Sequence, residues 1–202
     1  MTGIAEAPRE MQPTYLSSGE NLLSVDGLTK RFDLKGGLLS PIKGRIHAVE
    51  NVSFKLGVGE TLSLVGESGC GKSTTGRAIL RLIEPDAGTV MLKEADITKL
   101  SGSELRKRRK DMQMVFQDPF ASLNPRLSIG AAISEPMLLQ AGINKRLVRE
   151  RVSHLLREVG LNPNMADRYP HEFSGGQRQR ICIARALALD PKLIIADEAV
   201  SA

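Results

Sequence analysis

Short apolar runs separated by turn residues predict the strands of this protein. Residues 21–32 and 47–56 carry such runs, which indicate antiparallel strands joined by an extended loop that contains glycine and proline. Residues 61–65, TLSLV, lead directly into a glycine-rich segment, and we predict a buried strand there. The runs MQMVF at 112–116 and KLIIAD at 192–197 predict two more buried strands.

Helical spacing of apolar residues predicts three helices. One follows the glycine-rich segment and ends at Pro85, and a second spans 144–159 and stops at Gly160. An Ala-rich helix spans 178–189. Together with the strands, these helices indicate an α/β fold.

The order of the elements predicts how the chain is divided. We assign residues 21–118 and 174–202 to an α/β core and residues 119–173 to a helical subdomain. Residues 1–20 hold no continuous apolar run, so we expect a flexible tail and no secretory signal. Because no run approaches the roughly 18 apolar residues of a membrane helix, we expect no membrane span.

Composition narrows the class further. The chain has 202 residues, and 41% of them are hydrophobic, which excludes disorder for the bulk of it. Its two cysteines, Cys70 and Cys182, are too few for a disulfide framework or a four-cysteine zinc site. A reducing cytosol fits this usage best.

The net charge of +5 comes from one stretch of sequence. Residues 106–110 are five consecutive basic residues, and without them the chain has 23 basic and 23 acidic residues. A solvated helix face is the favoured interpretation, and an anionic partner stays open. A nucleic-acid surface would spread its charge and interleave aromatic residues, so we expect no nucleic acid as a partner.

The strongest candidate site is the glycine-rich segment, which matches GxxxxGK[ST] between a predicted strand and a predicted helix. Its glycines let backbone N–H groups and the helix N-terminus face a triphosphate. Lys72 would neutralise the β- and γ-phosphates, and the hydroxyl of Ser73 would ligate Mg²⁺. The segment consists of Gly66, Glu67, Ser68, Gly69, Cys70, Gly71, Lys72 and Ser73.

A pair of acids follows the last predicted strand. Asp197 and Glu198 would place one carboxylate near a metal and the next near an attacking water. Two acids at a strand end are common, but downstream of a phosphate loop they are a strong signal.

The segment Ser174, Gly175, Gly176 and Gln177 allows two interpretations. Ser174 followed three positions later by Gln177 fits a capping box, which we favour for the segment taken alone. An exposed helix start with two glycines also offers N–H groups to a second phosphate. The two interpretations are compatible.

Four motifs in order, GESGCGKST, FQDP, FSGGQRQR and LIIADE, resemble those of the ATP-binding subunit of an ABC transporter. The resemblance covers about residues 21–202. More narrowly, FQDPFASLNPR followed by RYPHEFSGGQRQR resembles the oligopeptide, dipeptide and nickel importer branch. It implies a P-loop NTPase core with an antiparallel β subdomain and a helical subdomain. It also implies ATP hydrolysis, with ATP and Mg²⁺ as cofactors, that energises import of peptides or a related solute.

The resemblance also implies roles for single residues. Gln117 would reach the metal and the water, Asp197 would support Mg²⁺, and Glu198 would polarise the water. Thr74 would lie near the α-phosphate. Phe32 is the best candidate for stacking on adenine, although a core position for it is equally open.

Partners follow from the same resemblance. Two such subunits sandwich two ATP molecules, so Ser174–Gln177 would contact the nucleotide held by a second ABC ATPase subunit, identical or paralogous. Residues 118–140 would bind transmembrane permease subunits, and a solute-binding protein would act indirectly. The implied location is peripheral, on the cytoplasmic face of the plasma (inner) membrane.

The sequence departs from the family after the acidic pair. Ala199 stands where the family has proline, and the three histidines all precede Asp197, so the usual switch histidine has no counterpart. The family places a further strand between the strand before Asp197 and the strand before the phosphate loop. Without it those two strands would lack their shared neighbour.

We therefore expect a C-terminally truncated domain that lacks part of its sheet, binds ATP weakly and does not hydrolyse it alone. Two alternatives stay open: a catalytically inactive ABC module, and, less favoured, a soluble ABC ATPase that acts on nucleic acid.

Overall fold

The computed structural model describes residues 20–35, 42–139 and 144–198. The predicted tail, the tip of the first loop, Ala199 and the residues after it lie outside this part. The strands are β1 (Asn21–Lys35), β2 (Ile42–Gly57), β3 (Ala87–Leu92), β4 (Ala95–Asp96), β5 (Met112–Val115) and β6 (Leu193–Ala196). The α-helices are α1 (Lys72–Ile79), α2 (Gly102–Arg108), α3 (Pro119–Ser122), α4 (Ile129–Leu138), α5 (Lys145–Glu158) and α6 (Gly175–Leu187). Short 3₁₀ helices are η1 (Arg109–Asp111), η2 (Pro163–Met165) and η3 (Pro170–Glu172).

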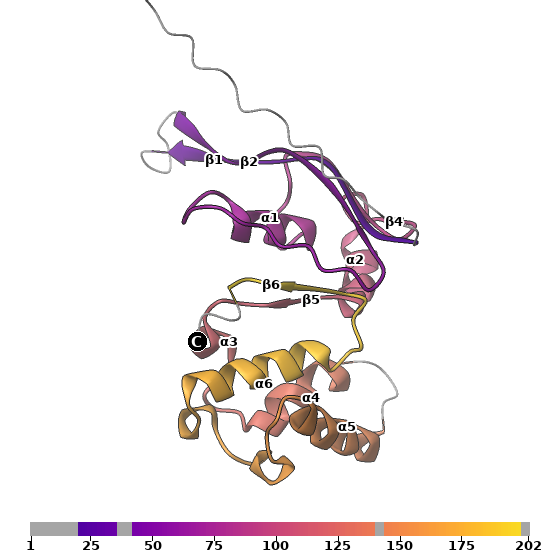
Figure 1. The fold of residues 1–202 in the computed structure, drawn as a ribbon, viewed down its shortest axis with the longest axis vertical. Helices are drawn as coiled ribbons and strands as arrows, with labels where there is room; N and C mark the ends of the chain where they lie inside the picture. The colour runs from indigo at the N-terminus through magenta and orange to yellow at the C-terminus, as the bar shows by residue number, and fades with distance from the viewer. Residues whose placement is uncertain (1–19, 36–41, 140–143, 199–202) are drawn as a thin grey trace, which may run out of the picture.

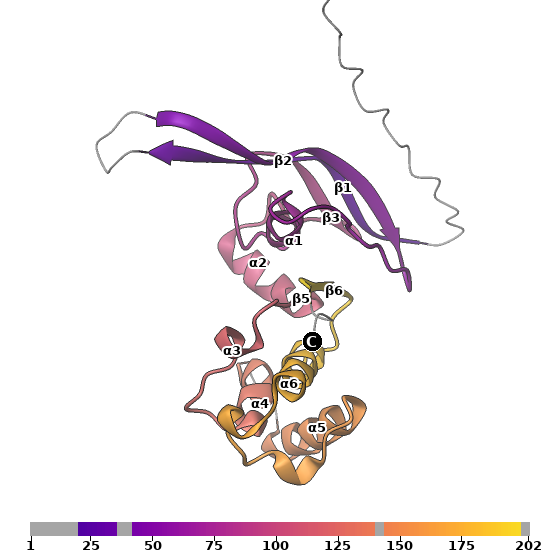
Figure 2. The same cartoon turned by 60° about the vertical axis from the view of Figure 1, so that its left-hand side comes forward.

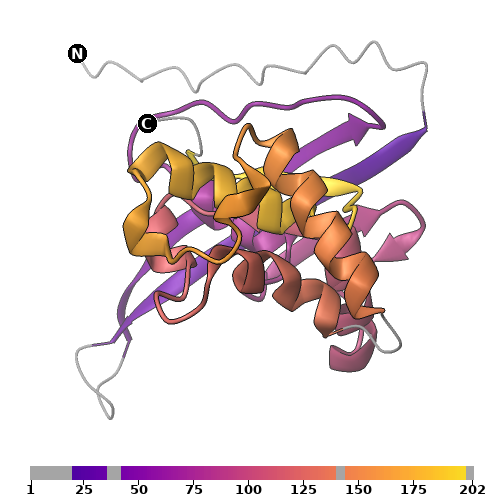
Figure 3. The ribbon, with the colours of Figure 1, turned by 90° about the horizontal axis from the view of Figure 1, so that it is seen from below.

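These elements stack in layers (Figure 1). An antiparallel sheet in the order β2-β1-β3-β4 forms one outer layer, α1 lies beneath it, and the parallel pair β5–β6 follows. Helices α3 to α6 form the opposite layer, which the turned view in Figure 2 separates clearly from α1. Seen from below, these helices cover the β5–β6 pair (Figure 3). The α/β fold predicted from the sequence is confirmed, whereas the boundaries assigned to its subdomains stay a prediction.

The hairpin of β1 and β2 is longer than its apolar runs indicated. Most of the predicted loop is strand, with Asp33 paired to Arg45 and Leu34 paired to Gly44 in the antiparallel register. Arg45 also donates to the Asp33 carboxylate at 2.8 Å. Cross-strand pairs of this kind stabilise a sheet with polar side chains, which is why the apolar pattern alone missed them.

The predicted strand at 61–65 is wrong for the described structure. Residues 60–67 belong to no strand, and Leu64 and Val65 have 43% and 93% of their surface exposed. The neighbouring β6 is only partly buried, because Ile194 is 41% exposed. No strand in the described ranges pairs with residues 61–65, so their apolar side chains have no layer to enter.

Two hydrophobic clusters support the fold. One joins the antiparallel sheet, α1 and the starts of β5 and β6, around the fully buried Leu28 and Val90. The other fills the helical layer, where Ile133, Leu155 and Ile181 are fully buried. Asn144 caps α5, with its side chain accepting from the Arg146 N–H at 2.9 Å.

The basic run 106–110 is a solvated surface with one exception. Most of it lies exposed on α2 and η1, as the favoured interpretation expected. Arg109 instead turns inward and donates to the carbonyl oxygens of Leu80 and Arg81, just past the end of α1. It therefore satisfies helix-end carbonyls that have no partner within α1, and burial lowers its pKa.

Candidate nucleotide-binding site

The glycine-rich segment forms a tight loop that leads into α1. Gly71 has a φ of 99°, and a Cβ there would lie 2.0 Å from the carbonyl oxygen of Ala48 on β2. A side chain is excluded by both the left-handed backbone and this contact. Glycine at this position therefore lets the loop close against β2.

Lys72 folds back over that loop. Its Nζ donates to the carbonyl oxygens of Gly66 and Glu67, at 2.8 Å each, and lies 3.8 Å from the Cys70 sulfur. These acceptors hold the ammonium group over a run of backbone that is exposed to solvent. An anion in the loop would meet a positive charge that is already in place.

The structure brings the loop and the acidic pair together. The Ser73 hydroxyl donates to Asp197 Oδ1 at 2.7 Å, and Asp197 is 7% exposed. Arg77 approaches the other carboxylate oxygen at 3.9 Å. The close approach of α1 to β6 explains this contact, because a Cβ on Gly76 would lie 2.9 Å from the Ile195 side chain.

Gln117 and Glu198 meet beside this contact. The Gln117 amide donates to Glu198 Oε2 at 2.5 Å, across the carboxyl ends of β5 and β6. Parallel strands bring their carboxyl ends to one edge of a sheet, which is where ligands of open α/β folds bind. Thr74 lies half-buried on α1, next to Ser73.

The oxygen donors of this site fit a magnesium ion. Mg²⁺ prefers carboxylate, hydroxyl and amide oxygens to sulfur or imidazole. Ser73 and Asp197 supply such oxygens at hydrogen-bonding distance from each other. Gln117 adds a side-chain amide group, which lies beside them because its nitrogen donates to Glu198. No group of three or more His, Cys, Asp or Glu residues in the described ranges is clustered for metal binding, so phosphate oxygens and water would have to complete the shell.

The segment Ser174–Gln177 lies apart from the phosphate loop. It starts α6 in the helical layer, on the other side of the β5–β6 pair from α1 (Figure 1). The predicted capping box is present, because the Ser174 side chain accepts from the Gln177 N–H at 3.3 Å and Gln177 accepts from the Ser174 N–H at 3.0 Å. Gly176 is exposed.

Phe32 lies on the exposed part of β1. Its ring is 39% exposed and pairs across the hairpin with Ile46, which is 50% exposed. The Lys30 ammonium lies 5.4 Å from the ring centroid. Ile46 is two residues before Ala48, which the phosphate loop contacts, so an apolar step lies beside that loop.

A charged cluster flanks this apolar step. Two guanidinium nitrogens of Arg31, Nε and Nη2, donate to the two carboxylate oxygens of Glu50. Glu50 Oε2 also lies 2.8 Å from His47 Nδ1. The hydrogen bonds from Arg31 lower the pKa of Glu50 to about 2. The carboxylate therefore stays charged over the physiological pH range.

Two nearby residues were missed from the sequence. Arg77 follows Ser73 by one helical turn, so it lies on the same face of α1 and reaches Asp197; this i, i+4 spacing was the available signal. Ile46 gave none, because it stands in the segment predicted to be a loop.

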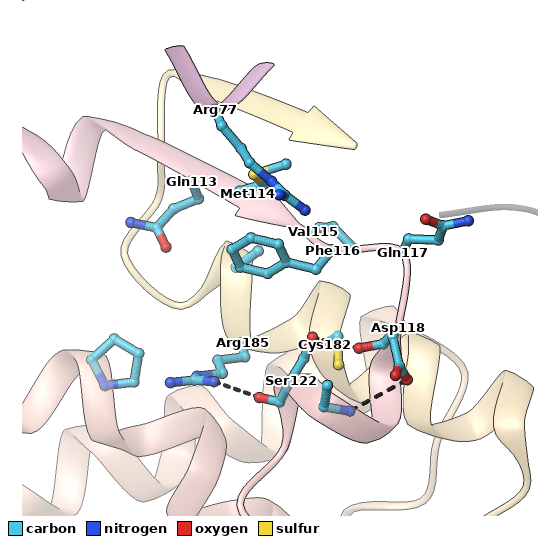
Figure 4. Close-up of a pocket in the computed structure, with 13 residues that line it drawn as sticks. Arg77, Gln113, Met114, Val115, Phe116, Gln117, Asp118, Ser122, Cys182 and Arg185 are labelled. Carbon is cyan, nitrogen blue, oxygen red and sulfur yellow. Dashed lines mark hydrogen bonds between the residues drawn. The ribbon is translucent and has the colours of Figure 1, made fainter. Parts of the chain in front are cut away.

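A cavity adjoins Gln117 (Figure 4). Its volume is about 610 Å³, and it is bounded by β5, α1, α3, α4 and α6. Arg77, Phe116, Ser122 and Arg185 are among its lining residues. The buried Cys182 also faces it, and desolvation raises the pKa of that thiol to about 11.

Comparison with known proteins gives the same class as the fold. A sequence model described as ABC transporter matches residues 49–201. The chain also superposes on a dimeric structure of MJ0796, a bacterial ABC transporter cassette, with a TM-score of 0.79 and 32% identity over 89% of this chain and 75% of that one. Similarity extends to cbiO1 from Clostridium perfringens, with a TM-score of 0.71, 25% identity, and 88% and 65% coverage.

Curated relatives include glutathione import ATP-binding proteins. Identity is 55% over 191 residues in Pectobacterium atrosepticum and 56% over 197 residues in Escherichia coli K12. These alignments cover 95% and 98% of this chain but 31% and 32% of the relatives. The chain thus spans about a third of the length of the curated relatives it matches.

The fold and these likenesses define a P-loop nucleotide-binding domain of the ATP-binding cassette type. The chain belongs to the ABC transporter family.

Proposed function

We propose that this chain is the ATP-binding and ATP-hydrolysing part of an importer that takes up peptides or a related solute. The observation that carries the proposal is the contact between Ser73 of the phosphate loop and Asp197 of the acidic pair. These residues are 124 positions apart, yet the fold sets their oxygens 2.7 Å apart at the end of β6. Such an arrangement is what a metal–triphosphate complex requires.

Each residue has a defined task in this proposal. Lys72 would exchange its carbonyl acceptors for phosphate oxygens, and Ser73, Asp197 and Gln117 would hold the metal. A bound Mg²⁺ supplies charge neutralisation to the phosphates. Glu198, held by Gln117, would orient the attacking water and accept its proton.

The remaining nucleotide contacts follow the geometry of the loop. The backbone N–H groups of residues 66–71, which include those of Glu67, Ser68 and Cys70, would surround the phosphates. Thr74 would lie near the α-phosphate. Phe32 and Ile46 offer an apolar step beside Gly71 for the base, since a flat ring surface suits stacking.

We propose that Ser174–Gln177 serve the nucleotide of a second subunit. The segment is the exposed start of a 13-residue helix and lies across the β5–β6 layer from the chain's own phosphate loop. A dimer would supply the missing counterpart. The MJ0796 cassette, whose fold this chain shares, is described as dimeric, with a related structure bound to ADP and Pi.

Permease subunits are the proposed membrane partners. None of the helices in the described ranges is long and apolar enough to cross a membrane. The cavity next to Gln117, together with Phe120 at 62% exposure, offers a surface within the segment 118–140. Binding there would place the chain peripherally at the cytoplasmic face of the membrane, with a solute-binding protein acting indirectly. Glutathione, a small peptide, is what the named relatives import, so we propose a solute of that size class.

A catalytically inactive ABC module is the second candidate, and the exposed segment 61–65 favours it. A phosphate loop whose preceding residues are unpaired is held less rigidly, and hydrolysis needs a pre-organised site. We therefore expect the 202-residue chain to bind ATP with little steady-state hydrolysis by itself.

Calorimetric titration with ATP, with and without Mg²⁺, tests nucleotide binding. Lys72→Ala should weaken the affinity about 10- to 100-fold, the size of a lost charge-assisted hydrogen bond. Lys110→Ala, an exposed lysine outside the site, is the matched control and should leave the affinity unchanged. Equal affinity in all three proteins would contradict the proposal. A measurement of phosphate release then separates the two candidates: rapid steady-state turnover of ATP would rule out the inactive module.

A further inference from the structure

A groove lies in the helical layer, away from the nucleotide-binding residues. Helices α4 and α5 pack side by side there (Figure 3), and the groove between them has a volume of about 710 Å³. This volume is within the usual range of small-ligand sites. The residues that line it are not those of the phosphate loop, the acidic pair or the cavity next to Gln117. A ligand bound in this groove would therefore not compete with a nucleotide.

The groove has an apolar floor and polar walls. Val148 and Val152 lie one turn apart on α5, and each is 5% exposed. Ser128 and Ser134 line the groove from the side of α4, where the Ser134 hydroxyl donates to the Ala131 carbonyl oxygen at 3.0 Å. Apolar surface with a few polar groups around it is typical of sites that bind small organic molecules.

Two positive charges lie along the α5 wall. Lys145 and Arg149 are four residues apart, so they share one face of the helix, and both line the groove. Among the residues that the structure describes, neither side chain makes an ion pair or a hydrogen bond. By contrast, Arg146 on a neighbouring face of α5 pairs with Glu150 at 3.0 Å. Like charges at this spacing repel each other, and a carboxylate between them would relieve that repulsion.

A negative charge also borders the groove. Asp167 is exposed, lines the groove, and makes no ion pair or side-chain hydrogen bond within the described ranges. The segment that carries it is held against the start of α4, because the Gly130 N–H donates to the Ala166 carbonyl oxygen at 2.8 Å. Glycine permits this approach, since a Cβ on Gly130 would lie 2.9 Å from that oxygen. The backbone of Asp167 therefore has a fixed place beside the groove.

The spacing of these charges sets the length of a ligand. Asp167 follows η2, which comes four residues after the end of α5, so Asp167 and Lys145 lie toward opposite ends of that helix. The lining residues of α5 run from Lys145 to Ser153, eight residues or about 12 Å of helix. An extended tripeptide spans about 10 Å. Its two charged ends would reach both ends of the groove at once.

We propose that this groove binds a short zwitterionic peptide of about three residues. The peptide carboxylate lies between Lys145 and Arg149, its ammonium group pairs with Asp167, and its side chains pack over Val148 and Val152. A simple anion fits less well, because the Asp167 carboxylate repels it. The site is separate from the nucleotide site, so the proposal goes beyond the proposed function and does not depend on it.

The test is a titration of the isotope-labelled full chain with trialanine, followed by two-dimensional NMR of the amide groups. The signals of Ser134, Arg149 and Asp167 should shift with one common dissociation constant, whereas the signal of Ser73 should not move. Two blocked peptides test the charges of the ligand. N-acetyl-trialanine lacks the ammonium group and trialanine amide lacks the carboxylate, so each should bind about three- to fivefold more weakly, as for an ion pair in contact with solvent.

Single substitutions assign each charge to its partner. Arg149→Gln should weaken binding of trialanine about three- to fivefold without weakening that of trialanine amide, because only the carboxylate loses its partner. Asp167→Asn should weaken binding of trialanine by a similar factor without weakening that of N-acetyl-trialanine. Arg157→Gln is the matched control, since it removes an exposed arginine of the same helix that does not line the groove. It should leave every affinity unchanged.

The outcomes are decisive in both directions. The proposal is overturned by an absence of shifts at the groove amides with millimolar peptide, by equal affinity for trialanine and both blocked peptides, or by equal losses in Arg157→Gln and Arg149→Gln. Tighter binding of N-acetyl-trialanine than of trialanine would show a plain anion site instead. The substituted residues are exposed, and unchanged amide signals outside the groove verify that each variant is folded. Failure of ATP to bind in the calorimetric titration would remove the proposed function and leave this result intact.

Discussion

Leu155 in α5 and Val65 before the phosphate loop are both aliphatic residues in apolar runs, yet the first is fully buried and the second is 93% exposed. The helical layer surrounds Leu155 with α4 and α6, so its helix has neighbours on its apolar side. Residues 61–65 have no strand beside them in the described ranges.

The difference shows what an apolar run requires. A helix satisfies its own backbone hydrogen bonds and needs only one packed face, whereas a strand needs a partner for every N–H and C=O along its edges. Burial of the side chains and pairing of the backbone are therefore lost together at 61–65. The acidic pair at the end of β6 keeps its geometry because β5 pairs with that strand.

The largest expected effect is in amide exchange. Residues 61–67 should exchange near the rate of an unstructured peptide, while the amides in the middle of α6 exchange only through opening of the packed layer. For a domain of ordinary stability the two rates should differ by at least about a thousandfold. Peptides from β1, which pairs on both edges, are the internal control. Strong protection at 61–67 would mean that a strand forms there in solution.

Stability measurements compare the same two regions by mutation. Leu155→Ala should lower the free energy of unfolding by about 2–5 kcal/mol, because it opens a cavity in a fully buried position. Val65→Ala should change it by less than about 0.5 kcal/mol, as for other exposed positions. Urea unfolding followed by circular dichroism measures both. A cost at Val65 that approaches the cost at Leu155 would contradict the exposure of residues 61–65.

The sequence predicted best where structure is local. The phosphate loop and the capping box at Ser174 depend on residues within a few positions of one another, and the described residues have the predicted turn and cap. The strand at 61–65 was wrong because its partner is a matter of tertiary pairing. The loop between β1 and β2 was overestimated because polar cross-strand pairs carry no apolar signal.

The candidate site was predictable in its members but not in its contacts. The motifs named Ser73, Gln117, Asp197 and Glu198, yet nothing in their spacing required that Ser73 meet Asp197 or that Gln117 meet Glu198. Arg109 illustrates the opposite case. It was part of a charge run expected to be solvated, but the end of α1 turns it into a capping residue.

A smaller effect on stability should distinguish Arg109 from the other residues of the basic run 106–110. Arg109→Ala should lower the free energy of unfolding by about 1–3 kcal/mol, because two carbonyl oxygens at the end of α1 lose a charged donor. Arg106→Ala, at an exposed position three residues earlier, should cost less than about 0.5 kcal/mol. Thermal unfolding resolves this difference. Equal costs would show that Arg109 is as solvated as its neighbours and that the α1 end is capped otherwise.

The smallest expected effect is on the free energy of unfolding at low pH, and it comes from the charged cluster beside Phe32. The pKa of Glu50 is lowered from 4.5 to about 2 by Arg31 and His47, so the folded protein binds a proton there only at lower pH than the unfolded chain does. Its contribution is complete above about pH 4.5 and is lost as the pH falls toward 2. Glu50→Gln should therefore flatten the fall in stability over that window. Glu84→Gln, whose partner Arg81 lies just past the end of α1, should leave it unchanged. Urea midpoints measured every half pH unit test this, and a parallel fall in all three proteins would show that solvent screens the pair completely.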